Sequence, residues 1–338
     1  MSMFSPASMM LLRHHNKFTK RHIIFSGNLQ DTLSVQLETE NSYIHTQQYH
    51  HWETLNKILQ TNVDFSLLPA SNIVDNCDTL IYYWPNNKKK AKFQLHNLLS
   101  LLTCGSDIFI VGEYSHGIRS AHNMLSSWVD LIKIDSAYRC GLYYGSLERK
   151  PYFNSYEFWH EHLVGGLILK SLPGVFGYNG LDHGTQLLLS TFSPGIQGKI
   201  LDIGCGTGVI SAVIASRSPL ANIMLTDVSA AALAASKATL LCNNLTGTVI
   251  ASNVYSKITG YFNMIVANPP FHDGSKVTLD IARTLIRGAP EFLYKGGELR
   301  IVANAFLPYH HILNEVFGHY TVIIHNKYFK VYSAKKTH

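Results

Sequence analysis

Short apolar runs alternate along this chain with longer segments in which apolar residues return every three or four positions. A short apolar run is typical of a buried strand, and the longer period is typical of a helix with one buried face. In the first half of the chain the pattern predicts strands at residues 21–27, 78–85 and 107–112 and helices at residues 46–59 and 92–102.

The alternation is more regular from Ile200 onwards. It predicts strands at residues 200–203, 222–226, 248–251, 262–267 and 298–302, helices at 209–216, 230–243, 279–294 and 310–317, and a closing hairpin at 320–325 and 330–333. Strands that alternate with helices in this way indicate parallel βαβ units. We therefore predict an α/β fold with mostly parallel, twisted sheets covered by helices on both faces.

The chain is too long for one ordinary domain. It has 338 residues, of which 46% are hydrophobic, so it can fill two cores of the usual size of about 100–200 residues. Residues 151–184 are rich in aromatic residues, glycine and proline, and we interpret them as a join and hairpin leading into the second domain. We therefore expect a first domain over residues 1–150 and a second over residues 185–338.

The two halves share a skeleton. Residues 23–27 align with 200–204, and residues 80–85 with 264–269. We interpret this as two tandem Rossmann-like domains produced by duplication, although chance similarity among βαβ units is the alternative.

The chemically distinctive residues of the second half have no counterpart in the first. In the alignment, Phe25 stands where the second half has Asp202, and Trp84 stands where it has Asn268. We therefore expect the N-terminal copy to be degenerate and to bind no cofactor.

Charge and cysteine content narrow the class of protein. The formal net charge is +6 and the pI about 8.9, which is compatible with a polyanionic partner. The five cysteines form no C-x-x-C pair, so neither a disulfide framework nor a metal site is expected. No apolar stretch approaches the roughly 20 residues needed to span a bilayer, and we expect a soluble cytoplasmic protein.

A glycine-rich turn follows the strand at residues 200–203. It carries the segment DIGCGTG, in which Cys205 lies between Gly204 and Gly206, with Gly208 at the end. A dinucleotide fingerprint requires G-x-G-x-x-G/A, and a P-loop requires Gly-Lys-Ser/Thr, and neither occurs here. The acid Asp202 before the glycines favours a cationic cofactor, and the pattern predicts binding of S-adenosyl-L-methionine.

Three further residues are candidates for the cofactor site. Asp227 follows the second strand, where an acid can accept hydrogen bonds from ribose hydroxyls, although it could instead cap the next helix. Asn253 could donate to the adenine edge or simply stabilise a turn. Phe176 could lie over the cofactor from the preceding loop.

The segment NPPF ends the strand at residues 262–267. The lone pair of an amine on a planar group is delocalised, and acceptors at Asn268 and the Pro269 carbonyl can orient it towards a methyl group. Pro269 and Pro270 hold the backbone because their φ angles are locked, and Phe271 offers a flat face for the target ring. From the residues alone, a base amine, a glutamine side chain and a non-catalytic RNA-binding or assembly factor all stay open.

At these residues the sequence resembles the class I S-adenosylmethionine-dependent methyltransferases, and specifically the bacterial ribosomal RNA small subunit methyltransferase C family. The likeness extends over the whole chain and includes HTQQYHHW, CDTLIYYWP, GLDHGTQLLLSTF, NPPFHDG and GELRIVANAFLPY. The family's cofactor motifs match Asp202, Gly204, Gly206, Gly208 and Asp227, and its catalytic motif matches residues 268–271.

The resemblance implies the partner and the reaction. It implies two methyltransferase-like domains, the first of them degenerate, and methylation of guanine N2 in 16S rRNA of the 30S subunit. We expect a monomer without metal. Lys88, Lys89 and Lys90 follow the Trp-Pro turn, and we interpret them as a polar loop that either is merely solvated or contacts the RNA backbone.

Overall fold

The computed structural model describes residues 4–59, 62–269 and 279–337. The chain forms two compact units, residues 1–158 and 159–338, and each is described by itself. In the described part of the chain no helix is both long and apolar enough to cross a membrane.

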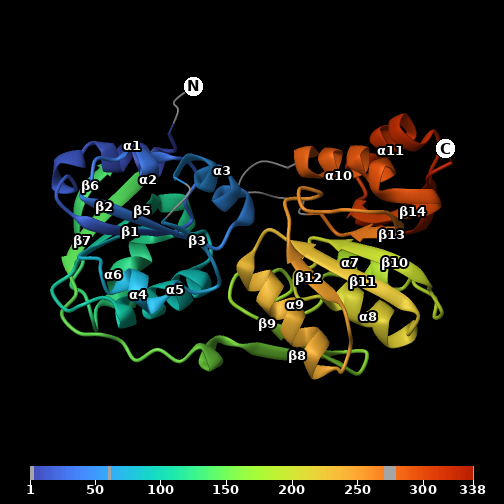
Figure 1. The fold of residues 1–338 in the computed structure, drawn as a ribbon, viewed down its shortest axis with the longest axis horizontal. Coiled ribbons are helices and arrows are strands. Elements are labelled where there is room, and N and C mark those ends of the chain that lie inside the picture. Colours follow the sequence, from blue (N-terminus) through green and yellow to red (C-terminus); the bar gives the residue numbers. More distant parts are fainter. Residues whose placement is uncertain (1–3, 60–61, 270–278, 338) are drawn as a thin grey trace. The chain divides into compact units, whose positions relative to one another are not determined.

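A seven-stranded sheet forms the centre of the N-terminal unit (Figure 1). Its strands are β1 (His22–Gly27), β2 (Asn41–Thr46), β3 (Val63–Phe65), β4 (Thr79–Tyr83), β5 (Asp107–Glu113), β6 (Ile132–Ala137) and β7 (Cys140–Ser146). They lie in the order β3-β2-β1-β4-β5-β7-β6. The strands from β3 to β5 are parallel, and β7 and β6 are antiparallel additions at one edge.

Helices cover both faces of this sheet. They are α1 (Pro6–Leu12), α2 (Leu33–Gln36), α3 (Tyr49–Leu59), α4 (Ser71–Val74), α5 (Lys88–Leu101) and α6 (Ala121–Leu125), with 3₁₀ turns at His15–Lys17, Tyr114–His116, Ile118–Ser120 and Ser155–Phe158. Apolar side chains of α1, α2 and α3 form the core on one face, and those of α4, α5 and α6 form the core on the other.

The helix expected at residues 92–102 begins earlier than the hydrophobic pattern indicated. α5 starts at Lys88, and Asn87 caps it because its Oδ1 accepts the N–H of Lys90 at 3.0 Å. Lys88, Lys89 and Lys90 therefore lie in a first helical turn, and the loop prediction was wrong. The sequence misled because lysines are unfavourable beside the positive end of a helix dipole.

A second seven-stranded sheet forms the centre of the C-terminal unit, beside a two-stranded hairpin. The hairpin is β8 (His160–Val164) and β9 (Leu167–Ser171), and the sheet contains β10 (Gly198–Ile203), β11 (Ala221–Asp227), β12 (Thr248–Ala251), β13 (Phe262–Ala267), β14 (Leu293–Asn304), β15 (Thr321–His325) and β16 (Phe329–Lys335). The sheet order is β12-β11-β10-β13-β14-β16-β15. β16 is antiparallel to both of its neighbours, β14 and β15, and β10 to β14 are parallel.

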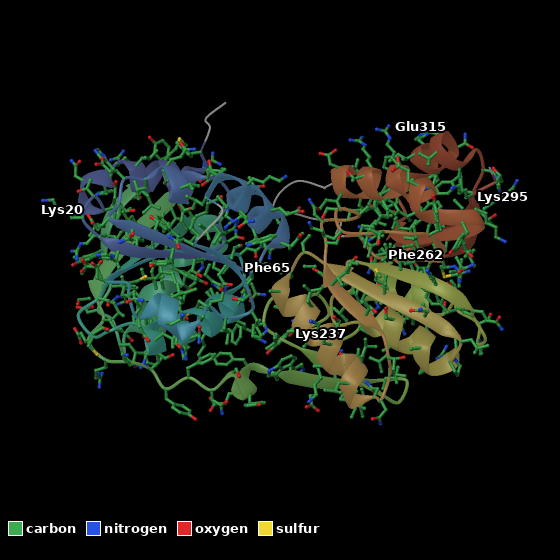
Figure 2. The ribbon with its side chains drawn as sticks, viewed as in Figure 1. Lys20, Phe65, Lys237, Phe262, Lys295 and Glu315 are labelled. Atoms are coloured by element: carbon green, nitrogen blue, oxygen red, sulfur yellow. The ribbon has the colours of Figure 1, made fainter. Side chains whose placement is uncertain are left out.

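The helices of the C-terminal unit also lie on both faces of its sheet. They are α7 (His183–Leu189), α8 (Val209–Arg217), α9 (Ala230–Cys242), α10 (Leu279–Phe292) and α11 (Tyr309–Phe317). Ile200 packs with α7, α8 and α9, while the next residue, Leu201, packs with α10 and α11, as the alternation of side chains along a strand requires. Phe262 belongs to the core formed with α10 and α11. Lys295 and Glu315 lie at the surface (Figure 2).

The segment between the two sheets divides at Phe158. The rings of Phe153 and Phe158 lie 5.9 and 5.1 Å from that of Phe93 on α5. Residues 151–158 therefore belong with the N-terminal unit, and the hairpin β8–β9 belongs with the C-terminal unit. The hairpin is held there by α9, because Thr239 Oγ1 accepts the N–H of Lys170 at 2.9 Å.

The two seven-stranded sheets have the same strand order and the same strand directions. β1 corresponds to β10, β4 to β13, and the edge pair β7–β6 to β16–β15. α1 and α7 also correspond, since each packs on the strands next to the antiparallel edge. This agreement supports the duplication inferred from the sequence.

Strand pairing corrects the alignment of the two halves by one residue. Phe25 pairs with the residue two positions before Tyr83, and Asp202 pairs with the residue two positions before Asn268. If Phe25 corresponds to Asp202, then Tyr83, and not Trp84, occupies the place of Asn268. Both Phe25 and Tyr83 are buried, and neither offers a carboxylate or an amide.

Candidate active site

The glycine-rich loop joins β10 to α8. Gly204, Gly206 and Gly208 have φ angles of 74°, 53° and 77°, which residues with a Cβ rarely adopt. The N–H groups of Gly204 and Cys205 donate to the carbonyl of Thr226 in β11, at 2.8 and 3.0 Å. A Cβ added to Gly204 would meet no atom within 4 Å, so a ligand can approach this backbone closely.

Gly208 has a different role from the first two glycines. It is the N-cap of α8, and a Cβ at this position would lie 2.9 Å from the Cβ of Ser236 in α9. Glycine is therefore needed at 208 for the packing of α8 on α9 as well as for its positive φ.

Asp227 ends β11 and holds the glycine loop in place. Its Oδ2 accepts the N–H of Gly206 at 3.0 Å, and its Oδ1 accepts the N–H of Ser229 at 2.8 Å. Desolvation raises the pKa of Asp227, while these N–H donors lower it. Ser229 is the N-cap of α9. Each oxygen of Asp227 keeps a second acceptor site, which ribose hydroxyls can use.

Asp202 is fully buried within β10. The Ser211 hydroxyl of α8 donates to its Oδ2 at 2.7 Å, while its Oδ1 has no hydrogen-bond partner among the described residues. Burial raises the pKa of Asp202 to about 7, although the hydrogen bonds from Ser211 lower it. Asp202 does not line the adjoining cavity, so its contact with a cationic cofactor group stays a prediction.

A narrow cavity opens in front of the glycine loop. Phe176, Gly204, Cys205 and Gly206 line it together with Asn268. The Phe176 side chain is 58% exposed, and its carbonyl oxygen would lie 3.3 Å from a Cβ on Gly206. The structure thus brings the loop preceding α7, the glycine loop and the end of β13 to one place.

Asn253 stays outside this cavity. It is exposed after β12, and its backbone N–H donates to the Ser256 hydroxyl at 3.0 Å in a turn. A role of its side chain in binding adenine therefore stays a prediction.

The side chain of Asn268 is held through its nitrogen, Nδ2, and not through its oxygen, Oδ1, among the described residues. Its Nδ2 donates to Thr185 Oγ1 at 2.8 Å and to Asp182 Oδ2 at 3.2 Å, so both amide hydrogens are engaged. Its Oδ1 is buried and has no partner among the described residues. Such an oxygen can accept one N–H from a ligand in the cavity.

Asp182 and Thr185 were not predicted as functional residues. Asp182 is the N-cap of α7, and its Oδ2 accepts the N–H of Thr185 at 3.0 Å. The sequence signal, an acid before a short amphipathic helix, indicates a helix cap and says nothing of a partner in β13. His162 of β8, whose buried Nδ1 has no partner among the described residues, also lines the cavity and was missed.

Of the remaining NPPF residues, only Pro269 is among the described residues. Pro269 is buried directly after β13. Pro270 and Phe271 lie outside the described residues, so the stacking role of Phe271 stays a prediction.

The residues present fit S-adenosylmethionine. Open space faces Gly204, acceptor sites remain on Asp227, and Phe176 offers an exposed ring beside the glycine loop. Asp227 would hold the ribose, and the glycine loop would hold the amino-acid portion. Among the described residues, no group of three or more His, Cys, Asp or Glu side chains is arranged to hold a metal ion.

The three lysines of α5 belong to the N-terminal unit. Lys88 and Lys89 are exposed, and Lys90 is half-buried. Desolvation lowers the pKa of Lys90 to about 8.

Two family models match the chain. The methyltransferase small domain matches residues 166–333, and the methyltransferase small domain N-terminal matches residues 8–162. The two matches coincide closely with the two units of the structure.

Curated relatives match over the full length. The ribosomal RNA small subunit methyltransferase C of Erwinia tasmaniensis is 56% identical over 337 residues, covering 100% of this chain and 98% of the relative. The protein of the same name from Escherichia coli K12 is 55% identical with the same coverage.

A solved structure supports the fold. A 16S rRNA N2 methyltransferase (RsmC) from T. thermophilus, in complex with AdoMet and guanosine, matches with a TM-score of 0.87 at 21% identity, covering 98% of this chain and 92% of the other. Fold, family models and full-length relatives agree, and the chain therefore belongs to the ribosomal RNA small subunit methyltransferase C family.

Proposed function

We propose that this protein transfers a methyl group from S-adenosylmethionine to the exocyclic N2 of a guanine in 16S rRNA. The observation that carries the proposal is the Asn268 side chain at the cavity of the glycine loop: its two amide hydrogens are engaged, and its Oδ1 has no hydrogen-bond partner among the described residues. An oxygen held in this way selects a ligand that donates an N–H. The names of the curated relatives support small-subunit rRNA as the substrate, and the T. thermophilus N2 methyltransferase, solved with guanosine, supports guanine as the source of that amine.

The chain's own residues orient the amine rather than activate it with a strong base. The lone pair of an exocyclic amine is delocalised into the ring, so the nitrogen is a weak nucleophile until its N–H groups are fixed. Asn268 Oδ1 accepts one N–H, and the Pro269 carbonyl, held by the locked φ of proline, accepts the other. S-adenosylmethionine, when bound, supplies an electrophilic methyl group. After transfer the nitrogen is acidic, and its extra proton passes to water.

Asn268→Ala tests the proposal. The change should leave cofactor affinity and melting temperature nearly unchanged. It should slow single-turnover methylation of 30S subunits by roughly 10²–10³-fold, the scale for one preorganised hydrogen-bonding group at a reacting centre. Asn222→Ala, a change at the exposed opposite end of β11, is the matched control. Transfer by Asn268→Ala at the wild-type rate would contradict the role of Asn268.

The position of the methyl group decides between the candidate substrates. Labelled cofactor is incubated with separate pools of 30S subunits, 50S subunits and release factors, and the products are digested and identified. Label on guanine N2 from 30S subunits is expected. Label on adenine N6 or on glutamine would replace guanine as the substrate. Cofactor binding without any transfer would favour an RNA-binding assembly factor.

The proposal extends to the location of the reaction, the oligomeric state and the need for a metal ion. We place the reaction in the cytoplasm, with the protein acting as a monomer and without a metal ion. Sedimentation of the purified protein and assay in the presence of a chelator check the last two points.

A further inference from the structure

A wide groove of about 1020 Å³ lies within the C-terminal unit. Three segments form its walls: α7 with the residue that follows it, the loop after β14, and the turn between β15 and β16. None of the residues assigned above to the cofactor or to catalysis lines this groove.

The walls of the groove are next to elements of the candidate active site. Asp182, which accepts an amide hydrogen of Asn268, is followed directly by His183, the first groove residue of α7. At the other wall, Asn304 ends β14, which pairs with the strand leading to Asn268. A chain whose target nucleotide is bound at Asn268 would therefore extend into the groove.

Two exposed aromatic rings stand at the groove. The side chain of Phe306 is 74% exposed and that of Tyr328 is 64% exposed. The segments that carry them are tied together, because the N–H of Ala305 donates to the carbonyl of Tyr328 at 2.7 Å. Asn326 Oδ1 also accepts the N–H of Tyr328 at 2.9 Å. These rings are therefore presented on an ordered backbone.

The polar groups of the groove suit a nucleic acid. The Lys327 ammonium lies 5.5 Å from the Tyr328 ring centre, and no Asp or Glu is among the described residues that line the groove. The side-chain amides of Gln186 and Asn304 have no hydrogen-bond partner within the described part of the chain. Aromatic rings that stack bases, a cation beside them and free amides are the usual combination in binding of single-stranded RNA.

We infer that this groove binds the RNA strand next to the target guanine. Phe306 and Tyr328 stack on unpaired bases, Lys327 neutralises a phosphate, and Gln186 and Asn304 contact base edges. The inference rests on the proposed function, because it takes the strand to be that of the methylated RNA.

Binding of a short RNA tests the inference without requiring catalysis. The probe is a fluorescein-labelled pentaribonucleotide with a central guanosine between uridines, titrated into the full chain in the presence of S-adenosylhomocysteine. Phe306→Ala and Tyr328→Ala should each weaken binding by roughly 5- to 150-fold, corresponding to a stacking contribution of about 1–3 kcal/mol per base. Tyr328→Trp should retain affinity, and its fluorescence should be quenched by the RNA.

Tyr294→Ala is the matched control. Tyr294 is 42% exposed and lies at the opposite end of β14 from the groove, so this change should leave RNA affinity unaltered. Melting curves confirm that the variants fold. In methylation of 30S subunits, the groove variants should raise KM for RNA and leave kcat nearly unchanged, which a general structural defect would not do.

These experiments distinguish a failure of the RNA-binding inference from a failure of the proposed guanine methylation. If both alanine variants bind the probe with wild-type affinity, or if the wild type does not bind it, the inference that the groove binds RNA is contradicted. Displacement of a Tyr328→Trp signal by a glutamine-containing peptide but not by RNA would also overturn it, in favour of a protein substrate. Binding that depends on Phe306 and Tyr328 together with methylation of a different acceptor would retain the groove and reject the guanine assignment.

Discussion

At the scale of residues, Asn268 depends on partners that precede it by 86 and 83 positions. An amide can turn over and exchange its oxygen and nitrogen, so its neighbours decide which end faces the substrate. A carboxylate can only accept a hydrogen bond. Asp182 therefore holds Nδ2 towards itself. We propose that it leaves Oδ1 for the amine and so acts as a positioning residue for the reaction.

Asp182→Ser should separate this role from helix capping. Serine can still cap α7, but its short side chain cannot hold the Asn268 amide as the carboxylate does. We expect kcat to fall by roughly 10- to 100-fold, the value of a hydrogen bond to a charged group, with cofactor affinity and melting temperature nearly unchanged. A loss that appears only as reduced thermal stability would leave Asp182 as a helix cap.

Asp202→Asn should reduce the pH dependence of stability in the absence of cofactor. An ordinary aspartate loses its proton near about pH 4, whereas burial raises the pKa of Asp202 to about 7 in the folded protein. Between these values the folded state binds more protons than the unfolded state. The free energy of unfolding therefore falls as the pH rises, by up to about 4 kcal/mol for this group.

Thermal melts at about pH 5 and about pH 8 check this expectation, since they lie on either side of the titration. The wild type should lose more stability between them than Asp202→Asn does. Equal losses would mean that the Asp202 carboxyl titrates normally.

At the scale of elements, the start of α5 is a place where stability and RNA binding can oppose each other. Its first turn contains lysines and no acid. Removing positive charge there should stabilise the helix by about 0.3–1 kcal/mol per residue. Lost phosphate contacts should instead weaken RNA binding and reduce its log–log salt slope by about 0.7–0.9 per contact.

Lys88→Gln/Lys89→Gln tests both effects in one protein. Melting curves report the stability of the fold, and binding titrations of 16S rRNA at several salt concentrations report the phosphate contacts. Lys20→Gln changes another exposed lysine of the same unit (Figure 2) and serves as control. A salt slope equal to that of the wild type would show that the lysines of α5 are simply solvated.

Local motifs were predictable from the sequence because strand, turn and helix follow one another in it. The glycine loop and the position of Asn268 at the end of β13 belong to this class. The partners of Asn268 were not predictable, because α7 and β13 meet only in the folded sheet. The start of α5 was missed for a different reason. Asn87 favours the beginning of a helix, whereas the lysines that follow it disfavour one.

At the scale of the whole molecule, the two sheets have the same strand order, and we expect only the C-terminal one to carry a cofactor site. The fold and the duplication were predictable because both halves repeat the same alternation of strands and helices. The sequence alignment placed Trp84 opposite Asn268 because each precedes a proline. Strand pairing shows that the counterpart of Asn268 is the preceding residue, Tyr83. The buried rings of Phe25 and Tyr83 occupy the places of Asp202 and Asn268.

One cofactor should therefore bind per chain. Calorimetric titration with S-adenosylmethionine should give a stoichiometry of one. Asp227→Ala should remove or greatly weaken that single binding event, because the change removes the carboxylate that accepts the N–H groups of Gly206 and Ser229. Ser229→Ala, which removes only the cap of α9, is the control. Two binding events per chain would show that the N-terminal unit retains a cofactor site.

The orientation of the Asn268 side chain, with its buried Oδ1 left to accept a hydrogen bond, also bears on which atom of the base is methylated. Besides its amine, guanine carries O6 and N7, which have lone pairs and no hydrogen, and both are readily alkylated in solution. Placed against Asn268 Oδ1, either atom would meet the amide oxygen lone pair to lone pair and be repelled. We therefore expect the hydrogen-bond polarity of the Asn268 side chain, set by its contacts with Asp182 and Thr185, to disfavour methylation of O6 and N7 on the base whose amine is modified.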